Sequence, residues 1–132
     1  MPSLTMSDER EERRAVVILS TAPASEAGDL ARYLVDRHLA ACVNVMPVQS
    51  FYRWEGAVYH EPEDLLIIKT TADLAERVTT TICSHHPYQV PEVIVLPIVN
   101  GSVPYLAWIR EMTRGEGGPE SAPHRAGGLG EE

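Results

Sequence analysis

The chain has 132 residues, of which 44% are hydrophobic, 23% charged and 6% aromatic. This length favours a single domain, and the apolar fraction is typical of a folded protein rather than a disordered one. The formal net charge is −8 and the sequence has no block of Lys or Arg, which disfavours a nucleic-acid-binding protein. No apolar run approaches the roughly 20 residues that span a bilayer, so no membrane partner is expected.

Composition divides the chain into three zones. Half of residues 1–14 are charged, and the segment lacks the apolar stretch of an export signal, so we expect a flexible arm and a cytoplasmic protein. Residues 15–114 hold nearly all the Val, Ile and Leu and are predicted to form one folded domain. Residues 115–132 hold six of the nine glycines and a single Leu, so this tail is predicted to be disordered.

The first half of the domain predicts a strand, a helix and a hairpin. The β-branched run 15–19 is typical of a central strand. Apolar residues at helical spacing then predict a helix ending near Leu39, and residues 42–45 resume extended character. Two aromatic or β-branched runs surround Glu55-Gly56, which indicates a hairpin with a tight turn.

The second half predicts a strand, a helix, a strand and a short helix. Pro62 is expected to interrupt the strand that returns from the hairpin, which resumes at 65–69. A helix capped by Thr70 or Thr71 carries an apolar stripe at i, i+4 and i+8, formed by Leu74, Val78 and Ile82. Residues 93–96 form a fourth strand, and a last helix starts at Ser102 or Pro104 and runs through Ile109.

This order predicts an α+β fold, a ferredoxin-like βαββαβ sandwich with an extra C-terminal helix and a long hairpin between the second and third strands. The helices pack on one face of the sheet, so the other face needs a cover. A second copy of the chain is the economical cover, and we therefore expect an oligomer.

A polar cluster at the end of the second helix is the first candidate site. It contains Cys83, His85 and His86, and imidazoles bind copper, nickel and zinc well. Adjacent residues point about 100° apart on a helix, however, and His86 precedes a proline that favours an extended backbone. The alternative is a structural role at the helix C-terminus, where the dipole favours positive charge.

The hairpin supplies a second candidate site. It contains Tyr52, Trp54 and neighbouring polar side chains, a composition typical of a subunit interface or of a ligand cleft between subunits. Lys69 and Glu92 lie at the ends of apolar strands and are expected to form a partly buried pair. Cys42, like Cys83, is predicted to be a buried free thiol.

Sequence patterns typical of enzymes are missing. The domain has almost no glycine, so it contains neither a Walker-type nor a Rossmann-type nucleotide loop. No Ser lies in a G-x-S-x-G turn, the setting of a hydrolase nucleophile. We therefore expect no catalytic residue and no organic cofactor.

Six blocks of the sequence follow one another along the domain, namely 17–23, 39–44, 52–56, 68–70, 85–92 and 105–109. In composition and order these blocks resemble the CutA family of divalent-cation tolerance proteins. The resemblance implies a ferredoxin-like protomer, a homotrimer, a cytoplasmic setting and an association with copper and other divalent cations. Members proposed to bind copper use a Cys in the first-strand motif and the paired His before Pro-Tyr. His85 and His86 match that pair, whereas Ser20 occupies the Cys position, and Cys83 is a candidate replacement.

Three hypotheses follow. The first is a trimer that binds Cu(II) or another divalent cation through His85 and His86, since a hydroxyl at Ser20 is a poor ligand for Cu(I). The second is a PII-like sensor of small molecules or nucleotides, with residues converging at an inter-subunit cleft, namely Tyr52, Trp54, Lys69 and Glu92. The third is a purely structural trimer whose effect on metal tolerance is indirect.

Overall fold

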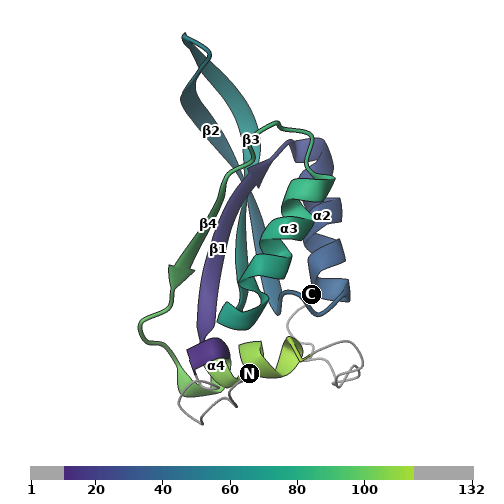
Figure 1. The fold of residues 1–132 in the computed structure, drawn as a ribbon, viewed down its shortest axis with the longest axis vertical. Coiled ribbons are helices and arrows are strands. Elements are labelled where there is room, and N and C mark those ends of the chain that lie inside the picture. The colour runs from purple at the N-terminus through teal and green to yellow at the C-terminus, as the bar shows by residue number, and fades with distance from the viewer. Residues whose placement is uncertain (1–10, 115–132) are drawn as a thin grey trace, which may run out of the picture.

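The computed structural model describes residues 11–114. The chain runs in the order β1 (Ala15–Ala22), α2 (Ala24–Asp36), β2 (Cys42–Trp54), β3 (Ala57–Thr71), the 3₁₀ turn η1 (Ala72–Leu74), α3 (Ala75–His85), β4 (Val93–Pro97) and α4 (Val103–Met112). The strands form one antiparallel sheet in the order β2-β3-β1-β4 (Figure 1). The α+β class and the long hairpin are confirmed, while the predicted disordered tail lies outside the described residues. Within residues 11–114 no helix has the length and apolar character needed to cross a bilayer.

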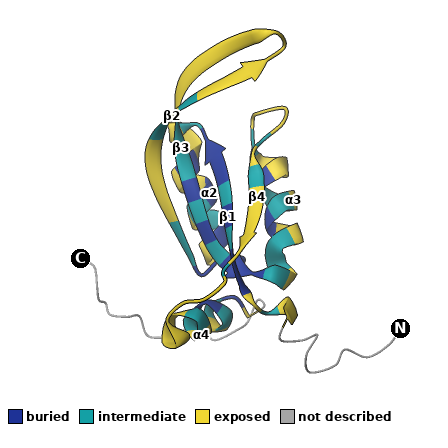
Figure 2. Cartoon of the chain, turned by 90° about the vertical axis from the view of Figure 1, so that its left-hand side faces the viewer, coloured by how far each residue is buried: buried dark blue, intermediate teal, exposed yellow. Residues whose placement is uncertain are grey.

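The core lies between the sheet and the helices α2 and α3, which cover the same face (Figure 2). Side chains alternate across a strand, so Val16 and Ile18 of β1 point toward the helices and are buried. The predicted stripe on α3 supplies Val78 and Ile82, each fully buried, and Leu34 is its counterpart on α2. Full burial of an aliphatic side chain stabilises a fold by about 1.5–3 kcal/mol, so these positions hold the two layers together.

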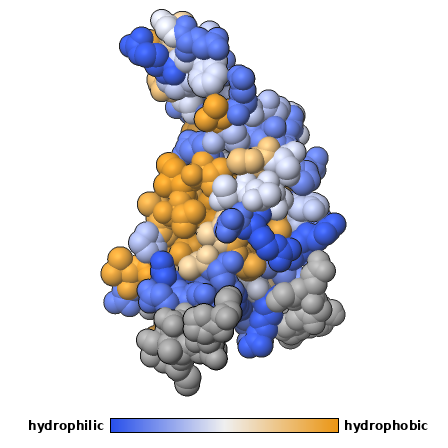
Figure 3. Space-filling view, viewed as in Figure 1, coloured by the Kyte–Doolittle hydropathy of each residue, from blue (hydrophilic) through white to orange (hydrophobic). Residues whose placement is uncertain are grey.

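The other face of the sheet is apolar and has no cover within the described chain. Strand pairing places Leu19 of β1 beside Ile94 of β4, and Val17 beside Leu96. Ile94 and Leu96 are 44% and 42% exposed. A continuous hydrophobic patch accordingly extends over β4 and β1 (Figure 3). A patch of this kind on a small domain marks an interaction surface.

The hairpin β2–β3 projects beyond the helical layer and is continuous through Pro62, in contrast to the predicted interruption (Figure 1). β1 pairs with β3 only as far as Asp64, so Pro62 lies where β3 has a single neighbour. Such a position tolerates a residue that lacks an N–H group. At the tip, Glu55 and Gly56 both have positive φ, 50° and 82°, which is the conformation that a two-residue hairpin turn requires.

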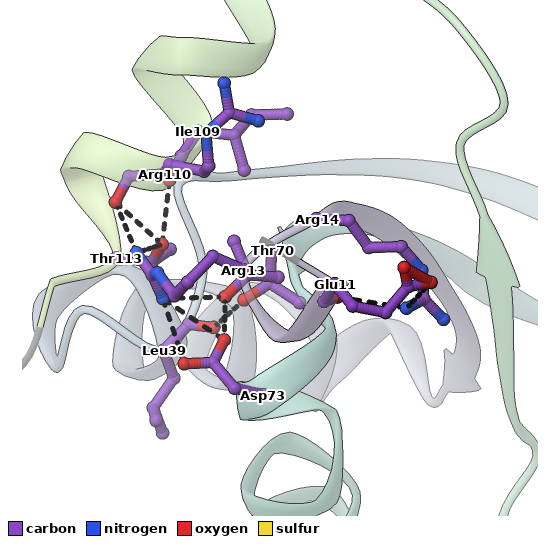
Figure 4. Close-up of polar contacts among 10 residues, drawn as sticks. Glu11, Arg13, Arg14, Leu39, Thr70, Asp73, Ile109, Arg110 and Thr113 are labelled. Carbon is purple, nitrogen blue, oxygen red and sulfur yellow. Dashed lines mark hydrogen bonds and ion pairs between the residues drawn. The ribbon is translucent and has the colours of Figure 1, made fainter. Parts of the chain in front are cut away.

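Arg13 joins the N-terminal segment to the far end of the domain (Figure 4). Its guanidinium donates to the Thr71 hydroxyl at 3.0 Å, to the Asp73 carboxylate at 3.1 Å and to the Arg110 carbonyl at 2.6 Å. Residues 1–14 were expected to form a flexible arm, but the packed part of the chain includes Arg13. The forked guanidinium explains the difference, because it serves a carboxylate and a carbonyl near the end of α4 at the same time.

Candidate functional site

The two adjacent histidines lie where α3 ends. His85 is the last residue of the helix, and His86 is extended, with φ −100° and ψ 140°. This change of backbone conformation is expected before Pro87, because proline disfavours a helical residue in front of it. The predicted end of the helix is thereby confirmed, and both histidines line one cavity beside α2 while making different hydrogen bonds.

Both ring nitrogens of His86 have partners. Nε2 lies 2.6 Å from the Thr21 carbonyl, and the Tyr88 N–H donates to Nδ1 at 3.1 Å. A carbonyl only accepts and an amide N–H only donates, so these contacts assign the proton to Nε2. The ring also contacts that of Tyr88, with centroids 4.4 Å apart. His86 therefore connects the loop after α3 to the end of β1.

His85 keeps one ring nitrogen free. Nδ1 lies 2.9 Å from the Thr81 carbonyl and donates to it, which leaves the Nε2 lone pair without a partner in the described structure. The centroid of the His85 ring lies 5.0 Å from that of Tyr33, and His85 lines a cavity of about 370 Å³ together with His86 and with Glu26 and Asp29 of α2. Metal-binding imidazoles commonly have this arrangement, in which one N–H is held by a carbonyl.

Ser20 and Cys83 do not join the histidines. Ser20 is fully buried on the helix-covered face, and its hydroxyl has no hydrogen-bond partner in the described part of the chain. Cys83 was predicted to be buried but is exposed, because Ile82 takes the core-facing position of α3 and the next residue turns away from it. Among residues 11–114, no three His, Cys, Asp or Glu side chains are grouped closely enough to hold a metal ion.

Lys69 does not pair with Glu92, which corrects the expected ion pair. Its ammonium donates to the Asn44 side chain and lies 3.8 Å from the Cys42 thiol. The register explains this, because Lys69 faces Val17 on one side and Cys42 on the other. Glu92 precedes β4, whose first residue pairs with Ser20 near the opposite end of β1.

A second cavity, of about 550 Å³, lies between the hairpin and the loop that follows α3. Figure 2 shows the hairpin leaning over this loop. The cavity is lined by three of the residues predicted to form a ligand cleft, namely Tyr52, Trp54 and Glu92. Lys69, the fourth residue of that prediction, does not line it. Three of the four residues predicted to converge therefore line one cavity of a single chain, and the cleft between subunits stays a prediction.

Two phenols near this cavity donate to carboxylates. Tyr88 donates to Glu63 at 2.9 Å, and Tyr52 donates to Glu61 at the same distance. Burial, followed by the bond to Glu63, raises the pKa of Tyr88 far above its ordinary value of 10.0, and the bond to Glu61 raises the pKa of Tyr52. Sequence reasoning missed Glu63, although the alternation of residues 59, 61 and 63 places all three on the face of Tyr52.

Comparisons with known proteins agree on one family. The family model described as "CutA1 divalent ion tolerance protein" matches residues 15–112. "Protein CutA, chloroplastic" of Arabidopsis thaliana is 45% identical over 114 residues, which are 85% of this chain and 63% of the relative. The chain thus spans less than two thirds of that plant protein.

Two further comparisons cover nearly the whole of the known protein. "Divalent-cation tolerance protein CutA" of Thermus thermophilus is 44% identical over 99 residues, 74% of this chain and 96% of that relative. The solved structure described as "PII-like protein CutA from Nostoc sp. PCC 7120 in apo form" has a TM-score of 0.73 at 34% identity, and the match covers 76% of this chain and 99% of that one. The family match accordingly covers residues 15–112 of the described part of the chain.

Proposed function

This chain belongs to the CutA1 divalent ion tolerance family, and on that premise we propose that it binds divalent cations, copper among them, as a cytoplasmic trimer without catalytic activity. The observation that carries the proposal is the free Nε2 lone pair of His85. The Thr81 carbonyl orients the ring, and the lone pair is directed away from the hydrogen bond that Nδ1 makes.

Carboxylates near His85 favour a cation of intermediate hardness. Glu26 and Asp29 line the same cavity from α2, but they are not grouped with His85 closely enough to hold an ion as the structure stands, so the proposal requires one of these carboxylates to move toward His85 when a cation binds. Nitrogen and oxygen ligands suit Cu(II) and Zn(II), whereas Cu(I) prefers thiolates. The serine at position 20 therefore weakens the case for Cu(I) but leaves Cu(II) and Zn(II) as candidates.

Calorimetric titration with Cu(II) and with Zn(II) tests this assignment. We expect His85→Ala to lose most of the binding, and His60→Ala, which removes another exposed histidine, to bind like the wild type. His86→Ala should retain binding wherever it folds, because both nitrogens of His86 are already engaged. Equal binding by wild type and His85→Ala would refute the proposed ligand.

The trimer is supported by the shape of the protomer. The strand order β2-β3-β1-β4 is that of a ferredoxin-like βαββαβ unit, and its helix-free face is apolar. Copies that pair through sheet edges would cover this face, and the projecting hairpin can reach a neighbour. Light scattering should give three times the 14.6 kDa of one chain, and a stable single-chain particle would refute the trimer.

A second candidate function is the sensing of a small molecule at the cavity beneath the hairpin. The cavity of about 550 Å³ has the size of a typical ligand site, and a similar solved structure is described as PII-like. A thermal-shift screen of metabolites and nucleotides separates the two functions. A clear response to metal with none to any metabolite would remove the sensor hypothesis.

A further inference from the structure

We propose that Asp29 of α2 is the second protein ligand of the cation bound by His85, so that one nitrogen and one carboxylate oxygen select the ion. This inference rests on the proposed function, because it names the residue that completes the same site. Glu26 and Asp29 both line the cavity beside His85, and the ion requires one of them to move. Their positions on α2, their contacts and their helix propensities favour Asp29.

Tyr33 indicates where His85 lies along α2. The centroids of the two rings are 5.0 Å apart, and the Arg37 guanidinium carbon lies 4.8 Å from the centroid of the Tyr33 ring. A helical side chain leans toward the helix N-terminus, so the Tyr33 ring covers the turn that contains Asp29. At a rise of about 1.5 Å per residue, Asp29 lies about 6 Å from Tyr33 along the helix axis and Glu26 about 10.5 Å. Asp29 is therefore the carboxylate nearer to the level of His85.

The Asp29 carboxylate is free to move toward the ion. Arg32, three residues further along α2, pairs with Asp36 at 3.7 Å, and within residues 11–114 no other ion pair involves this helix. Asp29 is exposed, so its side chain can change rotamer without disturbing the core. Because no ion pair has to break, the movement costs little beyond the ordering of one short side chain.

Aspartate is a poor choice at this position for the helix itself. Asp29 is the sixth of the 13 residues of α2, and Asp is unfavourable in a helix interior because its side chain competes for backbone groups. Glu26 lies in the first turn, where a negative charge stabilises the positive end of the helix dipole. Helix stability thus explains Glu26 but not Asp29, and a role in cation binding explains Asp29.

The site lies on the helical side of the protomer, away from the surfaces that the proposed trimer uses. Its walls come from α2, from the end of β1 at Ala22 and from the loop after α3 at Pro87. Copies that pair through the edge strands β2 and β4 and cover the helix-free face meet on the other side of the sheet from α2 and α3 (Figure 2). The contacts that place His85 beside Tyr33 lie within one chain, so they do not depend on a neighbouring copy.

The two donors define the class of cation. One imidazole nitrogen and one carboxylate oxygen leave two positions of a four-coordinate ion to water. This mixed set suits Zn(II) and Cu(II), whereas Mg(II) takes oxygen ligands and Cu(I) prefers thiolates. We therefore expect the site to bind Zn(II) and Cu(II) and to discriminate against Mg(II).

Calorimetric titration of the full chain with Zn(II) and with Mg(II) tests the assignment. Asp29→Asn keeps the size and the helix propensity of the side chain, and we expect it to bind Zn(II) about tenfold or more weakly than the wild type. Glu26→Gln should bind within about twofold of the wild type, because a screened charge that does not touch the ion contributes little. Asp36→Asn, a matched control on α2 outside the cavity, should also bind like the wild type.

Three results would overturn the inference. They are unchanged Zn(II) affinity in Asp29→Asn, a loss in Glu26→Gln as large as that in Asp29→Asn, and binding of Mg(II) as tight as that of Zn(II).

Guanidinium unfolding at one protomer concentration separates a metal ligand from a structural residue. Without metal, Asp29→Ala should unfold at a higher guanidinium concentration than the wild type, because Ala is the better helix former and no observed ion pair is lost. Zn(II) should stabilise the wild type by mass action and stabilise Asp29→Ala much less. Lower stability of metal-free Asp29→Ala, or equal stabilisation of both proteins by Zn(II), would contradict the inference.

His85→Ala in the same titrations keeps the two proposals apart. Loss of Zn(II) binding in His85→Ala together with normal binding in Asp29→Asn contradicts only the role of Asp29. Normal binding in His85→Ala contradicts the proposed function itself.

Discussion

Replacing His86 by Ala should destabilise the fold more than replacing its neighbour His85. His86 makes two hydrogen bonds, to the Thr21 carbonyl at 2.6 Å and from the Tyr88 N–H at 3.1 Å, and its half-buried ring contacts that of Tyr88. Each hydrogen bond contributes about 0.5–1.5 kcal/mol net, so we expect His86→Ala to lower the free energy of unfolding by about 2 kcal/mol. His85 makes one backbone bond, to Thr81, at an exposed helix end, and its loss should cost less than about 1 kcal/mol.

Guanidinium unfolding of both variants measures this difference. All samples need the same protomer concentration, because self-association makes apparent stability depend on concentration. If His86→Ala is as stable as the wild type and yet loses Cu(II) binding, then His86 is a ligand rather than an anchor, and the assignment of roles to the two imidazoles is wrong.

Three further changes test other contacts. Ser20→Ala should raise the free energy of unfolding by about 1–2 kcal/mol, because it removes a buried hydroxyl without a partner; a loss of stability would mean that the hydroxyl is satisfied. Thr70→Val should cost about 1–2 kcal/mol, measured by chemical unfolding, because the Leu39 carbonyl then loses its buried donor at 2.7 Å. The Tyr88 phenol should ionise at a higher pH than an ordinary tyrosine, because its pKa is raised. Its hydrogen bond to Glu63 stabilises the fold below pH 10, and this contribution is lost as the pH rises through the raised pKa of Tyr88. Ultraviolet titration of wild type and Tyr88→Phe tests this, and an unshifted phenolate signal would contradict it.

Much of the fold follows from local patterns in the sequence. The stripe of Val78 and Ile82 on α3 has helical spacing, so the buried face could be predicted from the sequence alone. The continuity of β3 through Pro62 could not, because it depends on where β1 stops pairing with β3. Propensity describes one segment, whereas the tolerance of a proline depends on its neighbours in the sheet.

In the candidate site, too, local patterns in the sequence predicted some features, whereas contacts between distant residues could not be predicted. The proline predicted where the helix ends, whereas the expectation that adjacent histidines would point apart did not indicate that His85 and His86 line one cavity. The partner of His86 on β1 is Thr21, 65 residues away, and no local pattern indicates that contact. The prediction that Lys69 pairs with Glu92 was wrong because strand register, which local patterns do not indicate, decides which side chains meet.

A crystal structure of the protein soaked with Zn(II) or Cu(II) tests the central claim most directly. The proposal predicts anomalous density about 2.0–2.1 Å from Nε2 of His85, with the Glu26 or Asp29 carboxylate moved toward the ion and His86 still bonded to the Thr21 carbonyl. Density bound by His86 instead, or none near either histidine at full soaking concentration, would contradict it.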